Sequence, residues 1–201
     1  MTRAEQFLGE ELNASENVQG TARFEVLPCP LEATVSYGTG AAKGPAAIIA
    51  ASHQLERLTL GQVPCAAGIF THAPIDCAPA VETVIDELRA TTAAIVGRGA
   101  IPVTLGGEHS ISYGAVMGVV DALDAPVGLV QVDAHADFRD AYQGHKHSHA
   151  SVMHLLAQEG LPIASLGVRA LAEEEETARR AHGVIAHDAA ALVRGNISSI
   201  T

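Results

Sequence analysis

The sequence has few aromatic residues and no long apolar run. Phe, Tyr and Trp together make up 3% of its 201 residues, and tryptophan is absent, so a folded core has to be built from aliphatic side chains. No apolar stretch approaches the roughly 20 residues that a membrane-spanning helix needs. The start of the chain also lacks the basic and apolar regions of a secretory signal. We therefore expect a cytoplasmic protein without a membrane partner.

Cysteine and positive charge are also scarce. The three cysteines, Cys29, Cys65 and Cys77, form no CxxC pair, so the sequence predicts neither a disulfide framework nor a thiolate zinc site. Twelve basic residues stand against 23 acidic ones, which gives a formal net charge of −11. No basic stripe offsets this charge, so we expect no nucleic-acid partner, and a small cationic ligand is mildly favoured. The acidic run at 173–176 is interpreted as a solvated helix face.

What the sequence does contain is a regular alternation of apolar runs and segments of helical period. The apolar runs predict buried strands at 24–27, 68–71, 101–105, 127–132, 163–167 and 183–186. The spacing of apolar residues between them predicts helices within 44–58, 80–99, 110–123, 148–160 and 171–183. This alternation is typical of an α/β fold with three layers, a parallel sheet between two layers of helices. Because no repeat or low-complexity linker interrupts it, residues 1–201 are interpreted as a single domain.

Two unusual polar segments each follow a predicted strand. GGEHS (106–110) comes after the run at 101–105, and DAHAD (133–137) comes after the run at 127–132. In open parallel sheets, ligands bind beyond the carboxyl ends of the strands. If these two strands are neighbours, their trailing loops converge on one site.

DAHAD places Asp133, His135 and Asp137 at alternate positions, with only alanines between them. On an extended backbone such residues point to the same side of the chain. The pattern predicts a metal site, and the alternative interpretation is a solvated strand end. Mixed carboxylate and imidazole ligands suit Mn²⁺, with Zn²⁺, Fe²⁺ and Co²⁺ as competitors.

Histidines provide the remaining candidates. His109 lies at the apex of GGEHS and is a candidate nitrogen ligand if its loop approaches DAHAD, with a structural role as the alternative. His149 follows Ser148, a candidate N-cap, and is expected at the start of the next helix, where an imidazole suits proton transfer. Three further histidines are interpreted as solvent-exposed: His145, His147 and His154.

Four motifs, in this order, resemble those of the ureohydrolase family, the group of arginases and agmatinases. They are ATVSYGTGAAKGPAAIIAASHQLE (33–56), PVTLGGEHSIS (102–112), VDAHADFRDAY (132–142) and HSHASVMH (147–154). The resemblance implies a parallel α/β fold of the arginase type with a binuclear manganese centre. It implies hydrolysis of a small cationic guanidino compound to urea and an amine by a metal-activated hydroxide, and assembly as a homo-oligomer.

The resemblance also implies roles for individual residues. His109 and Asp137 would bind one metal, His135 would bind the second, and Asp133 would bridge both. Asp137 would in addition orient the hydroxide, and His149 would act as a proton shuttle, so these two are the implied catalytic residues.

Two motifs are closer to the agmatinase branch, namely SYGTGAAKGP (36–45) and DFRDAY (137–142). They imply hydrolysis of agmatine to putrescine and urea, a step of polyamine biosynthesis. Arginase-type members have an asparagine two places after the final motif aspartate, where this chain has Arg139, so arginine is the less favoured substrate. Guanidinobutyrate or another ω-guanidino compound stays an alternative.

The last metal motif of the family, a string of the form SxDxDxxDP, has no counterpart in this sequence. After Asp137 the chain contains only Asp140 and Asp188, and neither lies in such a string. We therefore expect a C-terminally incomplete arginase-type domain whose second metal site is also incomplete. The alternative to an enzyme is a non-catalytic remnant that binds metal weakly or associates with a complementary chain.

Overall fold

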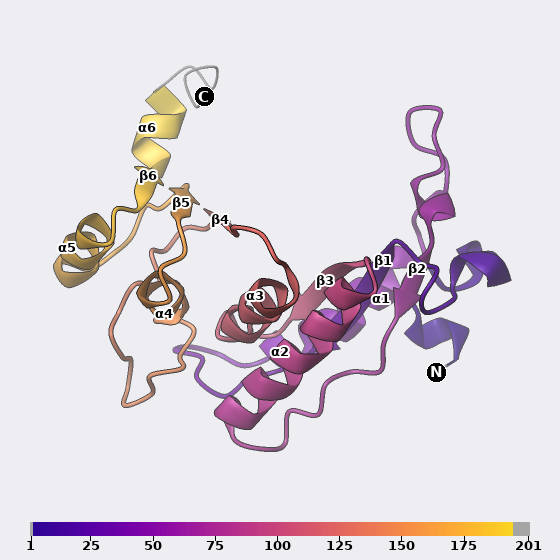
Figure 1. Ribbon diagram of the computed structural model, residues 1–201, viewed down its shortest axis with the longest axis horizontal. Helices are drawn as coiled ribbons and strands as arrows, with labels where there is room; N and C mark the ends of the chain where they lie inside the picture. The colour runs from indigo at the N-terminus through magenta and orange to yellow at the C-terminus, as the bar shows by residue number, and fades with distance from the viewer. Residues whose placement is uncertain (1, 195–201) are drawn as a thin grey trace. The chain divides into compact units, whose positions relative to one another are not determined.

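Parallel three-stranded sheets form the centre of both halves of the chain (Figure 1). The computed structural model describes residues 2–194 and divides into two units, residues 1–124 and 125–201. All six predicted strands are present, each with ends within two residues of the expected ones. The α/β fold with parallel strands is thus confirmed. No helix among the described residues is long and apolar enough to cross a membrane.

The first unit has the strand order β2-β1-β3. Its strands are β1 (Phe24–Cys29), β2 (Ile69–Thr71) and β3 (Ile101–Gly106), and its helices are α1 (Gly44–Ser52), α2 (Val81–Gly97) and α3 (Ile111–Ala122). β1 lies in the middle of the sheet and is buried from its second residue onward. The core beneath α2 is aliphatic, as the low aromatic content predicts, and it includes Leu27, Leu31, Val84, Leu88 and Ile95.

Helices α2 and α3 pack closely because α3 presents glycines to α2. A Cβ added to Gly114 would lie 2.5 Å from the carbonyl oxygen of Ile85, and one added to Gly118 would lie 2.4 Å from that of Arg89. Arg89 also donates a hydrogen bond of 2.7 Å to Asp121 near the end of α3. This packing fixes the helix that directly follows the GGEHS segment.

The second unit has the strand order β4-β5-β6. Its strands are β4 (Leu129–Val132), β5 (Ile163–Leu166) and β6 (Ile185–His187), and its helices are α4 (Val152–Gln158), α5 (Glu173–Ala181) and α6 (Ala189–Arg194). The short helix α6 is not predicted from the sequence. α4 buries Val152 and Leu156 and begins at Val152, four residues later than the predicted segment.

One face of the second sheet carries exposed apolar side chains. The strand register places Val130, Ala164 and Ile185 in one row across the sheet. Val130 is 71% exposed, Val132 80% and Ile185 61%, whereas Gln131, on the opposite face, is buried and accepts a hydrogen bond of 2.8 Å from Ser165. Parallel sheets usually bury both faces, so this exposed face is unusual.

The strands that precede the two polar segments are edge strands of separate sheets. Among the described residues, β3 pairs with β1 alone and β4 pairs with β5 alone. Within its own sheet, each of these strands therefore takes its backbone hydrogen bonds from one side only.

Glu108 fixes the loop that follows β1. It is 5% exposed and accepts hydrogen bonds from the backbone N–H groups of Ala33 (2.8 Å) and Thr34 (2.6 Å) and from the Thr34 hydroxyl (2.7 Å). Burial alone would raise the pKa of Glu108, but the hydrogen bonds from Ser110, Thr34 and Ala33 outweigh it and hold the pKa below its ordinary value. The GGEHS segment and residues 33–34 are thereby joined.

A second buried carboxylate, Glu25, lies within the sheet of the first unit. Its side chain is fully buried and forms hydrogen bonds with the Arg98 guanidinium (2.7 Å) and the His72 imidazole (2.6 Å). Burial would raise the pKa of Glu25, but the bonds from Arg98 and His72 outweigh it and lower the pKa. The ionised form of this residue therefore stabilises the folded state.

Replacing Glu108 by Ala should lower the free energy of unfolding by about 2–4 kcal/mol, because it leaves the N–H groups of Ala33 and Thr34 without their acceptor. Denaturant unfolding measures this loss. The control is Glu87→Ala at an exposed position of α2, which should change the stability little. Equal stability of the Glu108 variant and the wild type would contradict the anchoring role.

Glu25 should make the stability of the first unit sensitive to acid. Because its pKa is lower in the folded than in the unfolded state, its contribution is present above the unfolded pKa of about 4.3 and is lost as pH falls through the folded value. In Glu25→Gln the free energy of unfolding should decrease less steeply below about pH 5 than in the wild type. Glu82→Gln, at an exposed position, is the control, and an unchanged slope in the Glu25 variant would refute this contribution.

Candidate metal centre

Asp133 is the first residue after β4, and its carboxylate shapes the segment that follows. Its backbone N–H donates to the carbonyl oxygen of Leu166 (3.0 Å), which continues the sheet by one residue. Its side chain then accepts a hydrogen bond of 2.8 Å from the backbone N–H of His135. The chain therefore bends at Ala134, directly after the strand. His135 still forms a parallel bridge with Ala170, but the continuously extended backbone predicted for 133–137 is wrong, because the local bond competes with the extended form.

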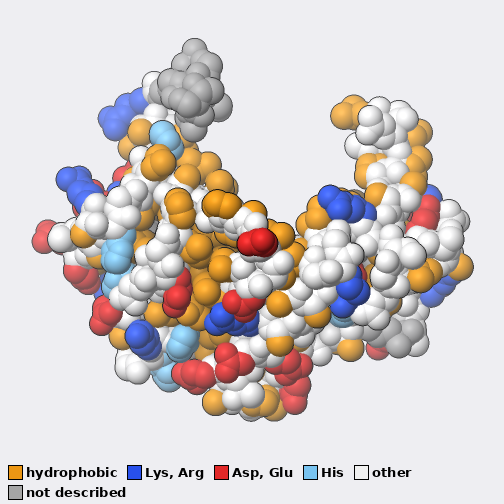
Figure 2. Space-filling view, viewed as in Figure 1, with side chains coloured by type: hydrophobic (Ala, Val, Ile, Leu, Met, Phe, Trp, Pro, Cys, Tyr) orange, Lys and Arg blue, Asp and Glu red, His pale blue; other side chains and the backbone are white. Residues whose placement is uncertain are grey.

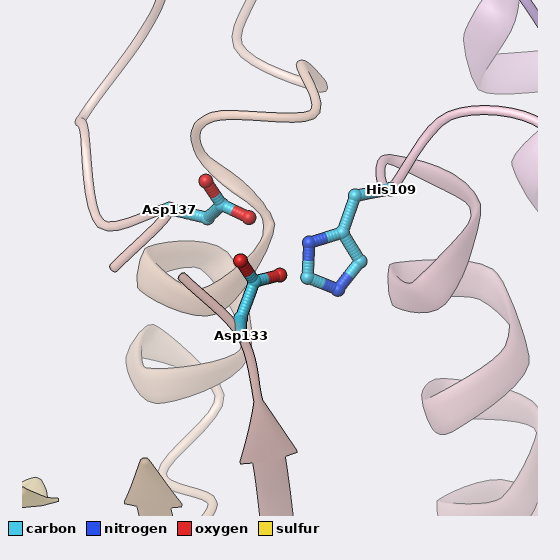
Figure 3. Close-up of side chains that lie close together, drawn as sticks. All are labelled: His109, Asp133 and Asp137. Carbon is cyan, nitrogen blue, oxygen red and sulfur yellow. The ribbon is translucent and has the colours of Figure 1, made fainter. Parts of the chain in front are cut away.

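Asp137 is held in a left-handed backbone conformation. Its φ is +49° and its side chain is buried. Few residues other than glycine adopt this conformation, and aspartate is among the more tolerant. A carboxylate oxygen of Asp137 lies within 4.8 Å of one of Asp133 (Figure 3). The predicted pair of aspartates is thus brought together within the second unit.

Glu175 fixes the chain directly after Asp137. It is 5% exposed, and its carboxylate accepts hydrogen bonds from the backbone N–H groups of Phe138 (2.9 Å) and Ala172 (2.8 Å). The interpretation of the acidic run as a solvated helix face is therefore wrong for Glu175, which caps α5 and binds the DAHAD segment at the same time. The neighbouring Glu174 forms an ion pair of 3.0 Å with Arg139.

The imidazole of His135 lies beside the aspartate pair but in solvent. Its side chain is 66% exposed, and its Nδ1 is 3.5 Å from Oδ1 of Asp133. The side chain is therefore accessible to an incoming ligand, with the carboxylate of Asp133 as its neighbour.

His109 belongs to the first unit, in the turn between β3 and α3, and Figure 3 shows its side chain in that turn. It is half-buried and lines a cavity of about 340 Å³ together with Gly106, Gly107 and Ser112. Gly107 is required there, since an added Cβ would lie 2.0 Å from the carbonyl oxygen of Leu31. The backbone beside His109 is therefore fixed by close contact.

Ser110 occupies the N-cap position of α3, but its hydroxyl forms no cap hydrogen bond. It donates instead to Glu108, at 2.6 Å. The residue thus supports the carboxylate that holds the GGEHS turn.

His149 does not begin a helix, and its predicted placement is wrong by three residues. α4 starts at Val152, because the chain first makes a turn in which the Ser148 hydroxyl accepts a hydrogen bond from the Ala150 N–H group (3.1 Å). His149 is half-buried, and its ring meets the Tyr142 ring edge-on, with 5.6 Å between centroids. The sequence did not single out Tyr142, which carries no local signal of this contact.

The remaining histidines differ in their exposure. His145 is exposed, as predicted, whereas His147 is half-buried. The side chain of His154 is only 13% exposed, and its ring stacks on Phe138 with 5.2 Å between centroids. The exposed interpretation is therefore wrong for His154, because the ring of Phe138 provides a flat apolar surface that the histidine covers.

The donor set of the second unit fits a divalent cation. Asp133 and Asp137 offer carboxylate oxygens close together, and His135 offers an imidazole nitrogen beside them. Such mixed oxygen and nitrogen donors suit Mn²⁺ and related transition metals without selecting one of them.

Comparison with known proteins identifies the family. Residues 22–201 match the sequence profile described as the arginase family. The N(1)-aminopropylagmatine ureohydrolase of Synechocystis is 38% identical over 178 residues, which are 85% of this chain and 57% of that protein. The agmatinase of Pyrococcus horikoshii is 31% identical over 160 residues, 77% of this chain and 54% of that protein. The chain thus spans a little over half the length of these relatives.

A solved structure agrees with the sequence comparison. The agmatine ureohydrolase of Thermoplasma volcanium resembles the chain with a TM-score of 0.83 and 31% identity, over 97% of this chain and 65% of that one. The predicted arginase-type fold is therefore confirmed, over part of its length in the relatives. Because the profile match extends from residue 22 to residue 201, the chain belongs to the arginase family of ureohydrolases.

Proposed function

We propose that this chain forms part of an agmatinase-like ureohydrolase, which hydrolyses agmatine to putrescine and urea with Mn²⁺. The observation that carries the proposal is the aspartate pair, Asp133 and Asp137, which lies directly after a parallel strand in a member of the arginase family. In this proposal residues 1–201 make up a single, incomplete ureohydrolase domain, which acts in polyamine biosynthesis. A cytoplasmic location and a homo-oligomeric state stay predictions.

The proposal assigns four metal ligands. Asp133 and Asp137 supply two carboxylates, His135 supplies a nitrogen from the same segment, and His109 supplies a second nitrogen. The two carboxylates neutralise one divalent cation. A second cation is expected to bind poorly, because within residues 2–194 the group with metal-ligand spacing contains no further carboxylate.

The reaction requires attack by water on the guanidino carbon and a proton for the departing amine. The bond between this carbon and the alkyl nitrogen breaks, and the oxygen of the water becomes the oxygen of urea. A bound divalent cation supplies Lewis acidity to such a site. Asp137 accepts a hydrogen bond from the water and orients it, and His149, held beside Tyr142, transfers a proton toward the leaving amine.

A second candidate substrate is N(1)-aminopropylagmatine. Three relatives that are 34–38% identical to this chain carry the name N(1)-aminopropylagmatine ureohydrolase, whereas one relative named agmatinase is 31% identical. Both compounds present the same guanidino group, and they differ in the cationic chain attached to it. Guanidinobutyrate stays a weaker alternative, and arginine is disfavoured by Arg139.

A second candidate function is docking of a complementary polypeptide by a non-catalytic chain. The exposed apolar face of the second sheet, with Val130, Val132 and Ile185, supports this alternative, since such a face is stabilised when another polypeptide covers it. Its test is whether urea release from agmatine appears only after mixing with the part of a longer relative that has no counterpart in this chain.

Titration with Mn²⁺ tests the ligand assignment without relying on activity. We expect about one Mn²⁺ per chain by calorimetry or by electron paramagnetic resonance, because two carboxylates neutralise one divalent cation. Asp137→Asn and His109→Ala should each weaken binding by at least about tenfold. The matched controls are Asp86→Asn and His145→Ala, both at exposed positions. Unchanged Mn²⁺ affinity in the Asp137 variant would overturn the site.

Urea release tests the proposed reaction. The folded, Mn²⁺-loaded chain should release urea from agmatine or N(1)-aminopropylagmatine faster than from guanidinobutyrate or arginine. His149→Ala should lower kcat by about 10²–10⁴-fold, the usual contribution of a proton-transfer group, and should leave Mn²⁺ affinity unchanged. A folded and metal-loaded chain that releases no urea from any of these compounds would favour the docking alternative.

A further inference from the structure

The histidine loop, as we call residues 139–150, follows the aspartate pair and leads to α4 (Figure 1). Its name refers to the histidine side chains at its surface, which are pale blue in Figure 2. At its base, the backbone N–H of Arg139 donates a hydrogen bond of 3.0 Å to the carbonyl oxygen of Ala150. Nearer its tip, Tyr142 and His145 exchange two backbone hydrogen bonds of 2.9 Å each. Hydrogen bonds therefore set the path of the backbone at both the base and the tip.

Helix α5 orients the side chain of Arg139. The guanidinium forms an ion pair of 3.0 Å with Glu174 and lies 4.0 Å from the carboxylate of Glu175. Glu175 is itself fixed, because it accepts hydrogen bonds from two backbone N–H groups. The pair with Glu174 is largely exposed and adds little to stability by itself. Its consequence is the direction in which the guanidinium points.

The same guanidinium lies over the ring of Tyr142. Its central carbon is 5.4 Å from the ring centroid, within the roughly 6 Å over which a cation is attracted to an aromatic face. A planar guanidinium also stacks on such a ring, whereas a lysine ammonium does not. Arg139 thus holds one face of the Tyr142 ring.

Tyr142 in turn limits the orientation of His149. The two rings lie at 84° to each other, with 5.6 Å between their centroids, which is a preferred geometry for aromatic pairs. Arg139 acts on the same histidine by a second route, because its N–H group binds the carbonyl oxygen of Ala150, the next residue. The side chain of Arg139 therefore reaches His149 through the Tyr142 ring, and its backbone reaches it through Ala150.

We propose that Arg139 and Tyr142 are positioning residues for His149. Arg139, oriented by α5, holds both the Tyr142 ring and the backbone beside His149, and the Tyr142 ring then holds the imidazole in one orientation. Proton transfer needs such an orientation, because a misplacement of about 1 Å can lower a rate by about 10²-fold. This inference rests on the proposed function, in which His149 transfers a proton to the leaving amine.

A purely structural role of the same two residues predicts different behaviour. If Tyr142 only stabilised the loop, its loss would lower activity whether or not His149 is present. If Tyr142 positions the imidazole, its loss matters only while the imidazole is there. The two roles are therefore separated by variants that combine changes at Tyr142 and His149.

Substitution of Tyr142 tests the ring contact. Tyr142→Leu should lower kcat for urea release from agmatine by about 10- to 100-fold, with little change in KM, because the imidazole loses its orientation. Tyr142→Phe keeps the ring and should restore kcat. His145→Ala, which removes an exposed side chain of the same loop, is the control. A Leu variant as active as the wild type, or a Phe variant as impaired as the Leu variant, would overturn the role of the ring.

A double-mutant cycle tests whether Tyr142 acts through His149. In the His149→Ala background, Tyr142→Leu should cause no further loss of kcat, because the group that it positions is already absent. Losses that multiply in the double variant would show a structural role and contradict the proposal.

Replacing Arg139 by Lys tests the first link of the chain. The variant keeps the charge and the backbone N–H group but loses the planar guanidinium, so kcat should fall in the same direction as in Tyr142→Leu. Arg169→Lys, at an exposed position, is the matched control. An Arg139 variant with the kcat of the wild type would remove Arg139 from the proposal.

Nuclear magnetic resonance tests the positioning without activity. The ring-proton signals of His149, identified by their loss in His149→Ala, should move in Tyr142→Leu toward those of a histidine in a short peptide, and should keep their positions in Tyr142→Phe. They are recorded before Mn²⁺ is added, because this ion broadens them. Unchanged signals in the Leu variant would refute the ring contact. A wild type that binds Mn²⁺ but releases no urea would instead overturn the proposed reaction, and with it the catalytic purpose of the contact.

Discussion

Carboxylates that accept hydrogen bonds from backbone N–H groups fix the loops on which the candidate site depends. Glu108 does this for residues 33–34, and Glu175 does it for Phe138. Parallel strands bring the loops to one edge of a sheet but leave the N–H groups of those loops without partners. Because a buried N–H group without an acceptor is costly, these two acidic residues determine the paths on which the candidate ligands lie.

Because several acidic residues are buried and paired, the net charge of the chain does not describe its surface. A charge of −11 suggests a surface that attracts cations, but Glu25, Glu108 and Glu175 are at most 5% exposed and bind backbone N–H groups, hydroxyls, an imidazole or a guanidinium. Part of the acidic excess is therefore structural. The case for a cationic ligand depends on the local pair of Asp133 and Asp137, not on the charge of the whole chain.

The strands were predictable from the sequence because each is a short apolar run bounded by polar residues, a signal contained within a few positions. The paired aspartates were predictable because their signal is also local, since both lie in the five-residue segment DAHAD. The features that the sequence did not predict depend on partners far away along the chain. Glu175 binds Phe138 across 37 residues, and His154 is covered by the same Phe138, so no local periodicity marks either contact.

The number of carboxylates limits the number of cations that this chain binds by itself. Asp133 and Asp137 bring two negative charges, which balance one divalent ion. Of the acidic groups that follow along the chain, Glu175 is bound to backbone N–H groups and Glu174 to Arg139, while Asp140 is 84% exposed and lies 4.0 Å from His154. To bind a second cation, each of these three carboxylates would have to break its present contact or leave the solvent. Among the described residues, Asp133 and Asp137 are also the only carboxylates in a group with the spacing of metal ligands, so a second divalent ion there would remain poorly neutralised.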